Sequence, residues 1–416
     1  METFRLQRRY QRTDPAGRCP SLLGYPSIEL NRLALFWRQL IDLNEAPFTQ
    51  LRFQALPLVV SWLADPGAAE EPWFAILSVP GLRNQVLRHA GLDDYICAEP
   101  SEVPTGLRTP RWQTLVDHVA GFEDLDVARR SLVVLALNQL TLGPCAVRLA
   151  GRIQVSHDPA SQTYAYEVAR ALGRNLPTSA GALNVYRWLA TSAVDPMRAI
   201  AACAQGLTYH IRGARDMAAA RPFMIRGLEL LGTVSARQDW QVNLLRSRMH
   251  RAIALLHFRD SDAAATQAAL RATVEASDSL CADSKCDSDS VVALLAREDR
   301  KIVVESQIKA AVVQPEDRAA EIEDRCAELA QIDPYCVDTK LTIGDAYAAI
   351  GKLDGAAVWY SRAGELGTGA GATGWFRAGQ CYDRLGDKAA ACTAMGRCLE
   401  LDGTAIEPAS YLAEAS

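Results

Sequence analysis

The chain has 416 residues, of which 49% are hydrophobic and 22% charged, and its formal net charge is -5. At about 150 residues per domain this length predicts two to three domains, and the apolar content excludes wholesale disorder. The acidic balance argues against a general binder of nucleic acid or anionic membranes, which is normally basic over its whole surface.

Residues 1–25 are expected to form a loosely ordered N-terminal arm. Its Arg8-Arg9 pair is similar to a twin-arginine signal, but no apolar stretch follows it. No run in the chain reaches the 18 apolar residues that indicate a membrane span. We therefore expect a cytoplasmic protein.

Residues 26–235 are predicted to form an irregular helical domain. Apolar residues recur at helical spacing over about 30–41, 112–119, 124–142, 160–172, 180–192, 196–220, 239–258, 262–276 and 290–313. Ser27 and Asp289 are expected to cap the first and the last of these helices, and Asp195-Pro196 is typical of a helix start. One alternation of apolar and polar residues, over 147–155, predicts a small β-hairpin. Because no series of strands follows, the fold class is all-α.

Basic residues are distributed unevenly along the chain. All six lysines lie between Lys285 and Lys388, so residues 1–284 contain none. This excludes a P-loop and a pyridoxal-phosphate lysine from that part of the chain. The excess of arginine over lysine, with many alanines and glycines, indicates a GC-rich and, we expect, bacterial genome.

Proline and glycine become rarer after about residue 233, which places the expected domain boundary near 235. Residues 236–416 are predicted to be an array of helical hairpins. Within this array the polar and acidic run 277–290 is expected to be an exposed loop, because its aspartates lack the spacing of a calcium-binding loop.

The last part of the chain contains a repeat with a period of 35 residues. Small and aromatic residues recur in the same order, first as Gly344, Ala346, Tyr347, Gly351, Ala356, Tyr360 and Ala363, and then as Gly379, Cys381, Tyr382, Gly386, Ala391, Met395 and Cys398. Small side chains allow two helices to approach closely, and a glycine ends the first helix of each pair. This pattern, with Trp375 four residues before Gly379, resembles the tetratricopeptide repeat, a helix-turn-helix unit of about 34 residues. The resemblance is clearest over 337–402 and extends, in degenerate form, to about 303.

The resemblance implies a superhelix whose first helices line a concave groove for an extended peptide or a partner helix. The matching groove positions are Asp338, Leu341, Asp345, Phe376, Gln380, Asp383 and Arg384. The Lys, Arg and Asn residues with which some family members clamp a terminal carboxylate are replaced here, so a carboxylate clamp is not expected. The aspartates favour a basic or polar ligand, and Phe376 favours an apolar anchor. Alternatively, the repeats extend the core or mediate self-association into a homo-oligomer.

The glycine-rich run 369–374 satisfies the G-x-G-x-x-G pattern of dinucleotide-binding folds. That fingerprint requires a strand before it and a helix after it within a strand-helix-strand unit. Because the run lies between two repeats, we interpret it as a flexible turn.

Few residues indicate catalysis or metal binding. The eleven cysteines are scattered through apolar segments and are expected to be buried thiols. Cys281 and Cys286 lie close together, but no second pair follows to complete a zinc site. His118 and His157 are expected to be solvated or capping residues rather than bases. We therefore expect no metal and no cofactor, and the catalytic residues, if there are any, are unknown.

Charge patterning gives one further signal. Residues 197–259 carry ten arginines against three acids, whereas 260–345 carry nineteen acids against nine basic residues. A basic patch is expected at Arg212, Arg215, Arg246, Arg248, Arg251 and Arg259. It could pair with the acidic segment inside the molecule, or it could bind an acidic partner or phosphate. Nucleic acid is the least favoured of these ligands.

Taken together, these patterns favour an adaptor or accessory protein that binds a protein or peptide through its repeats. The alternative is an enzyme or enzyme subunit of peptide modification or specialised metabolism, with a pocket in the N-terminal helical domain and the repeats as its substrate-binding module. A regulator is a weaker third hypothesis, because no helix-turn-helix with a basic recognition helix is evident.

Overall fold

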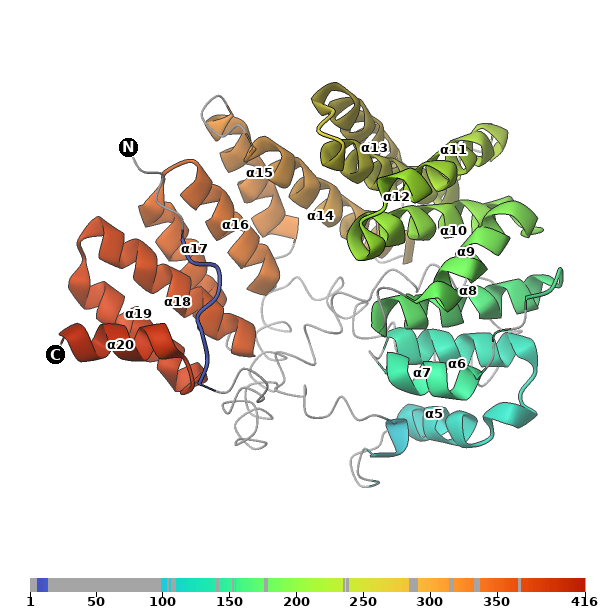
Figure 1. Ribbon diagram of the computed structural model, residues 1–416, viewed down its shortest axis with the longest axis horizontal. Helices are drawn as coiled ribbons and strands as arrows, with labels where there is room; N and C mark the ends of the chain where they lie inside the picture. Colours follow the sequence, from blue (N-terminus) through green and yellow to red (C-terminus); the bar gives the residue numbers. More distant parts are fainter. Residues whose placement is uncertain are drawn as a thin grey trace. The chain divides into compact units, whose positions relative to one another are not determined.

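The computed structural model describes most of the chain from residue 99 onward and one short segment near the N-terminus. The described residues are 6–13, 99–102, 105, 110–139, 142–151, 153, 155–175, 179–234, 236, 239–283, 291–313, 318–332, 337–365 and 368–415. Within them the fold is all-α, with sixteen α-helices that pack in sequential pairs, as Figure 1 shows. None of these helices is both long enough and apolar enough to cross a membrane. The expected helix at 30–41 and the expected caps Ser27 and Asp289 lie outside the described residues.

The chain divides into two compact units, which we describe separately. The first unit contains the described residues 99–303. Its elements are the short 3-10 helices η2 (Pro100–Glu102) and η4 (Phe122–Asp124), the α-helices α5 (Pro110–Ala120), α6 (Val127–Gln139), α7 (Gly143–Ala150), α8 (Pro159–Asn175), α9 (Ala180–Ser192), α10 (Pro196–Tyr209), α11 (Met217–Val234), α12 (Trp240–Arg259) and α13 (Ala263–Asp283), the π-turn η5 (His210–Ala214) between α10 and α11, and α14 (Val291–Ala311) as far as Val303.

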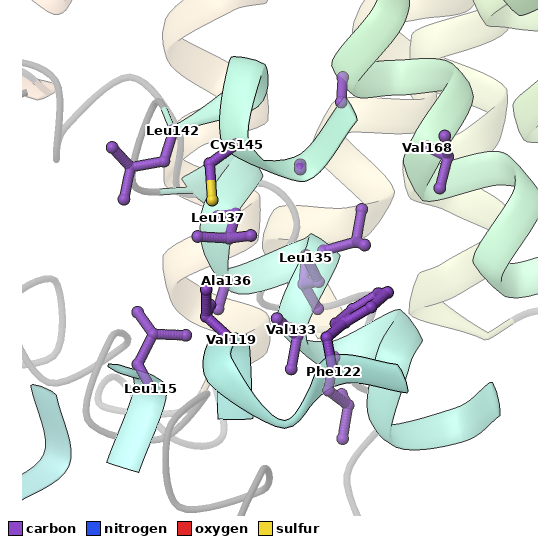
Figure 2. Packing of buried hydrophobic residues seen from close by; sticks show 14 residues of the cluster. Leu115, Val119, Phe122, Val133, Leu135, Ala136, Leu137, Leu142, Cys145 and Val168 are labelled. Carbon is purple, nitrogen blue, oxygen red and sulfur yellow. The ribbon is translucent and has the colours of Figure 1, made fainter. Parts of the chain in front are cut away.

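The core at the start of this unit forms around α6. Residues 132–137 of α6 are apolar and all buried, since α7 and α8 pack against this helix and α5 contacts it as well. A helix that is apolar on every side is stable only when it is enclosed. Figure 2 shows Phe122 of η4 beside Leu135, and Cys145 of α7 beside Leu137; Val168 of α8 belongs to the same cluster.

The predicted hairpin at 147–155 is wrong in its first half. Residues 143–150 form α7, which ends at Gly151 with a φ of 57°. The α7 residues Cys145 and Ala146 are buried, and Leu149 also packs on the core. A lone hairpin would have left its outer backbone groups without partners, whereas a helix satisfies them internally.

The single helix predicted at 196–220 is interrupted. Asp195 caps α10 as expected, and its side chain accepts a hydrogen bond from the Met197 backbone N–H. The helix then passes through the π-turn and ends at Arg215, which has the left-handed φ of 54°. Asp216 begins α11 by accepting a hydrogen bond from the Ala219 N–H. Apolar periodicity alone did not reveal this break.

The loop predicted at 277–290 is shorter than expected. Helix α13 continues to Asp283, and residues 284–290 lie outside the described part of the chain. The side chains of Ser277 and Leu280 are fully buried, and Leu280 packs with Leu244 and Leu295. Burial of these two residues keeps the polar stretch helical.

The second unit contains 304–415 together with residues 6–13. After the last part of α14, its helices are α15 (Ala319–Ile332), α16 (Val337–Ala349), α17 (Leu353–Glu365), α18 (Thr368–Leu385), α19 (Lys388–Leu401) and α20 (Ile406–Ala415).

Glycines explain the 35-residue repeat of this unit. A Cβ atom at Gly344 would lie 2.5 Å from the Tyr360 ring, and a Cβ atom at Gly379 would lie 2.8 Å from the Met395 side chain. The two positions therefore admit the large side chain of the paired helix. Gly351 and Gly386 have φ angles of 79° and 84° and end the first helix of each pair.

The glycine-rich run 369–374 is not a flexible turn, as the sequence had suggested, but the first part of α18. A Cβ atom at Gly374 would lie 2.7 Å from the Tyr360 carbonyl oxygen and 2.8 Å from the Gly364 nitrogen. Glycine thus allows the backbones of α17 and α18 to touch. This close packing, rather than nucleotide binding, accounts for the run.

Candidate functional site

An extended segment of the chain itself lies on one face of the second unit. Residues 6–13, which we call the N-terminal segment, have no helical structure and contact α18, the turn after α19 and the beginning of α20. Figure 1 shows this segment, in blue, passing over α18. The surface that holds it, which we call the segment face, consists of Phe376, Arg377, Gln380, Asp402, Thr404, Ala405 and Glu407, together with Leu341, which packs on the same apolar cluster as Leu6.

Two side chains of α18 bind the backbone of the segment. Gln380 acts as a peptide group would: its Oε1 accepts a hydrogen bond from the Gln7 N–H at 2.8 Å, and its Nε2 donates to the Gln7 carbonyl at 3.0 Å. Arg377 donates to the Arg8 carbonyl from both Nε, at 3.1 Å, and Nη2, at 2.9 Å. Contacts of this kind hold an extended chain without depending on its side chains.

Apolar anchors fix the segment at two points. Leu6 packs on the apolar cluster of α17–α19 that includes Tyr360 and Cys381. The Tyr10 ring meets the Phe376 ring edge-on, with 5.6 Å between the centroids. An edge-to-face pair at this distance is favourable beyond the area that it buries.

Acidic side chains hold the last part of the segment. The Asp402 carboxylate accepts a hydrogen bond from the Tyr10 hydroxyl at 2.8 Å and lies 3.1 Å from the Arg12 guanidinium. Asp402 is only 1% exposed, so this ion pair is little screened by solvent. Glu407 accepts hydrogen bonds from the Gln11 N–H and from the Gln7 side chain.

Backbone pairing completes the contact. Ile406 donates to the Gln11 carbonyl at 2.8 Å, and Thr13 donates to the Thr404 carbonyl at 3.0 Å. Arg12 and Ala405 therefore form an antiparallel β-bridge. The segment is held at this end as a strand would be.

Of the groove positions predicted from the repeat, Phe376 and Gln380 contact the segment directly, and Leu341 packs on the same apolar cluster as Leu6. Asp345 acts through Arg377, which binds the segment: its carboxylate accepts hydrogen bonds from Arg377 at 2.7 Å and from the Tyr360 hydroxyl at 2.6 Å. It therefore orients the arginine that binds the segment.

The remaining predicted positions have other surroundings. Asp383 accepts hydrogen bonds from Lys388 and from the Tyr411 hydroxyl, each at 2.5 Å. The bond from Lys388, followed by that from Tyr411, holds the pKa of the Asp383 carboxyl below its usual value. Asp338 and Arg384 are exposed.

The sequence reasoning missed Arg377, Asp402 and Glu407. Arg377 is one residue beyond a predicted groove position, and its guanidinium lies over the Tyr360 ring, 5.6 Å from the centroid. Asp402 and Glu407 lie at the end of the repeat, where no second copy exists for comparison. Their acidic character next to the last helix was the available signal.

The arginines of the predicted basic patch lie on two elements. Arg212 and Arg215 are exposed at the π-turn, whereas the other four lie on α12. Arg251 pairs with the buried Asp299 at 3.6 Å. Arg221 on α11 pairs with Asp260 at 2.7 Å. Both acids come from the acidic segment 260–345, so two of these ion pairs are internal, and an acidic partner for the patch stays a prediction.

A buried polar network connects the helices of the first unit. Glu167 on α8 has no exposed surface; it accepts a hydrogen bond from Arg170 at 2.9 Å, and its backbone carbonyl accepts one from Asn138 on α6. Arg198 on α10 lies over the Tyr166 ring, 4.8 Å from the centroid. These contacts join α6, α8 and α10.

Thiols and histidines show no catalytic arrangement within the part of the chain that the structure describes. Burial raises the pKa of Cys203, Cys326 and Cys381 to about 12, as expected for inert buried thiols. His118 Nδ1 lies 2.7 Å from the Thr114 carbonyl, and the His157 ring lies beside Trp188. No cluster of three potential metal ligands occurs among these residues.

Comparison with known proteins agrees with the geometry of the second unit. Residues 372–404 match the family model of the tetratricopeptide repeat. This match covers most of α18, all of α19 and the turn that carries Asp402. The chain therefore contains a tetratricopeptide repeat near its C-terminal end, a class of unit that mediates contacts between proteins. No curated protein matches the chain.

Proposed function

We propose that this chain is a cytoplasmic adaptor or accessory protein, and that its segment face holds one extended segment of a protein partner. One observation carries the proposal: residues 6–13 already lie on that face as an extended peptide, bound through their backbone by Gln380 and Arg377. A surface that binds peptide backbone in this way can bind another chain with the same contacts.

The position of the face supports this function. Its residues come from α16 and α18, the first helix of each pair, from the turn after α19 and from the start of α20; first helices are where a helical-repeat array presents its binding surface. Phe376 and Leu341 supply apolar contact, while Asp402 and Glu407 supply negative charge. An extended and basic segment therefore fits this surface best.

The test is affinity capture with the full chain and two double variants. In the face variant, Gln380→Ala and Glu407→Ala remove hydrogen-bonding groups that contact the segment but do not belong to the core. In the control variant, Arg397→Ala and Glu400→Ala remove an exposed ion pair on α19.

All three chains also carry Leu6→Ala, Tyr10→Ala and Arg12→Ala, because an intact segment would lose the same contacts as the partner and cancel the effect. We then expect the face variant to lose at least tenfold in capture of a partner, since several hydrogen bonds of about 1 kcal/mol each are removed. The control variant should capture as much as the chain with an unchanged face. Quantitative mass spectrometry of a lysate of the source organism measures both. Capture of no protein, or of proteins that the face variant retains in full, would contradict the proposal.

A further inference from the structure

We infer that the N-terminal segment is a displaceable occupant of the segment face, and that the partner's segment has the same chemistry: an apolar residue, a tyrosine four residues later and an arginine two residues after the tyrosine, within an extended basic peptide. This inference rests on the proposed function and specifies its ligand and its regulation.

Burial identifies the three residues. Leu6, Tyr10 and Arg12 are partly buried against the face, whereas Gln7, Arg8, Arg9 and Gln11 are exposed. The backbone bends at Arg8 and Arg9, so the side chains do not alternate there as they do in a strand. The face therefore contacts mainly the side chains at the first, fifth and seventh positions, and Gln7 adds a hydrogen bond to Glu407.

Each of the three positions has a partner of matching chemistry. Leu6 meets the apolar cluster of α17–α19. Tyr10 needs both the Phe376 ring and the Asp402 carboxylate, so phenylalanine would satisfy only half of its position. Arg12 contacts Thr404 Oγ1 at 3.0 Å and the Asp402 carboxylate at 3.1 Å, both through its Nε.

Charge favours a basic ligand as a whole. The segment carries Arg8, Arg9 and Arg12, and the face opposes them with Asp402 and Glu407. The side chains of Arg8 and Arg9 are exposed, so they act over a distance and mainly increase the rate of association. An acidic peptide would be repelled.

The binding contacts are few, so the segment can be exchanged. It is held by hydrogen bonds along eight residues and by two apolar anchors, and it contributes no helix to the fold. A ligand on the same chain binds intramolecularly, at an effective concentration set by the chain that joins it to the face. It therefore competes with any free peptide until the free peptide is abundant or tightly bound.

The experiment measures binding of a synthetic peptide with the sequence of residues 6–13, labelled with fluorescein, to the full chain by fluorescence anisotropy. Three chains are compared: the unmodified chain, the segment variant with Leu6→Ala, Tyr10→Ala and Arg12→Ala, and a control with Arg9→Ala, which removes an exposed charge. A second peptide carries Tyr10→Ala. Circular dichroism checks that the helices of each variant are retained.

We expect the segment variant to bind the labelled peptide at least tenfold more tightly than the unmodified chain and the control do. The Tyr10→Ala peptide should bind the segment variant at least tenfold more weakly than the unchanged peptide. Equal binding by all three chains, equal binding of both peptides, or no binding at all would each overturn the inference.

The same experiment separates this inference from the proposed function. If the labelled peptide does not bind the segment variant but the face variant still loses its protein partner, the inference fails and the proposed function stands. If the peptide binds as expected but every partner is retained by the face variant, the proposed function fails.

Discussion

At the scale of single residues, His210 has the least favourable surroundings in the first unit. It is 4% exposed, and within the described part of the chain neither ring nitrogen has a hydrogen-bond partner. The rings of Tyr209 and Phe223 lie 6.1 Å and 5.7 Å from it. A buried polar group without a partner costs about 1–3 kcal/mol. His210 also begins the π-turn that interrupts the helix after α10, a rare element in helices.

Burial lowers the pKa of His210; the charge of Asp216 opposes this shift and that of Arg187 adds to it. Below a pH of about 6.5 the His210 ring binds a proton in the unfolded chain but not in the folded chain. The contribution of the neutral ring to the free energy of unfolding is therefore fully present above that pH and is lost as the pH falls toward the pKa of the folded state. Burial, with Arg246 adding to its effect, also lowers the pKa of His250, which acts in the same direction.

We predict that His210→Leu raises the free energy of unfolding by about 1 kcal/mol at pH 7.5. The substitution should also weaken the dependence of this free energy on pH between 7.5 and 5.5. His250 retains the rest of that dependence. Urea denaturation at several pH values measures both effects. His157→Gln, at an exposed position, serves as the control. If the free energy of unfolding of the His210→Leu chain changes with pH as steeply as that of the unmodified chain, the prediction is refuted.

Residue patterns predicted part of the candidate site, and the reason is physical. Leu341, Phe376 and Gln380 were found because a helix repeats its faces at a fixed spacing, and the second repeat marks where each face lies. Asp402, Glu407 and Arg377 have no such periodic mark. Their role depends on the N-terminal segment, whose eight described residues carry no periodicity and lie almost 400 positions away in the sequence.

At the scale of helices, the close approach of α17 and α18 depends on Gly374. The nearest atoms to a new Cβ atom there belong to the backbone, at Tyr360 and Gly364, and cannot rotate away. The helix pair would therefore have to separate, which would open the packing around the fully buried Tyr360.

We predict that Gly374→Ala lowers the free energy of unfolding by about 1–3 kcal/mol, the usual range for overpacking. Gly396→Ala on α19 is the matched control: no atom outside its own helix surroundings lies within 4 Å of the new Cβ atom, so alanine should raise stability by about 0.5–1 kcal/mol. Thermal or urea denaturation distinguishes the two. Equal effects of both substitutions would show that the helix crossing is not tight.

The sequence predicted which segments are helical more reliably than it predicted where each helix begins and ends. The helix predicted at 180–192 is α9 with the same bounds, because Ser179 caps it and its apolar face is regular. The π-turn after α10 and the extension of α13 escaped prediction, since both depend on what tertiary packing buries. The alternation at 147–150 was misleading, because four residues are too few to separate a strand from a helix.

At the scale of the whole molecule, the N-terminal segment joins one end of the sequence to the helices near the other. Its backbone is held by Gln380, Arg377 and Ile406, so the segment must leave the face before a protease can bind it. Arg8 and Arg9 are natural trypsin sites within it.

We predict that Tyr10→Ala increases the rate of trypsin cleavage after Arg8 and Arg9 by about tenfold. This factor corresponds to a loss of about 1.4 kcal/mol in the free energy with which the segment binds the face. Mass spectrometry of the released peptides measures the rate. Thr393→Ala, at an exposed position on α19, should leave it unchanged. If the rate does not respond to Tyr10→Ala, the tyrosine does not hold the segment on the face.

The segment also runs along one helix and does not cross several. Gln7, Arg8 and Tyr10 meet Gln380, Arg377 and Phe376 of α18, while Gln11 and Arg12 are held at the start of α20 and the turn before it. The last repeat and the helix after it therefore supply these contacts, so unfolding of this one repeat would release the segment.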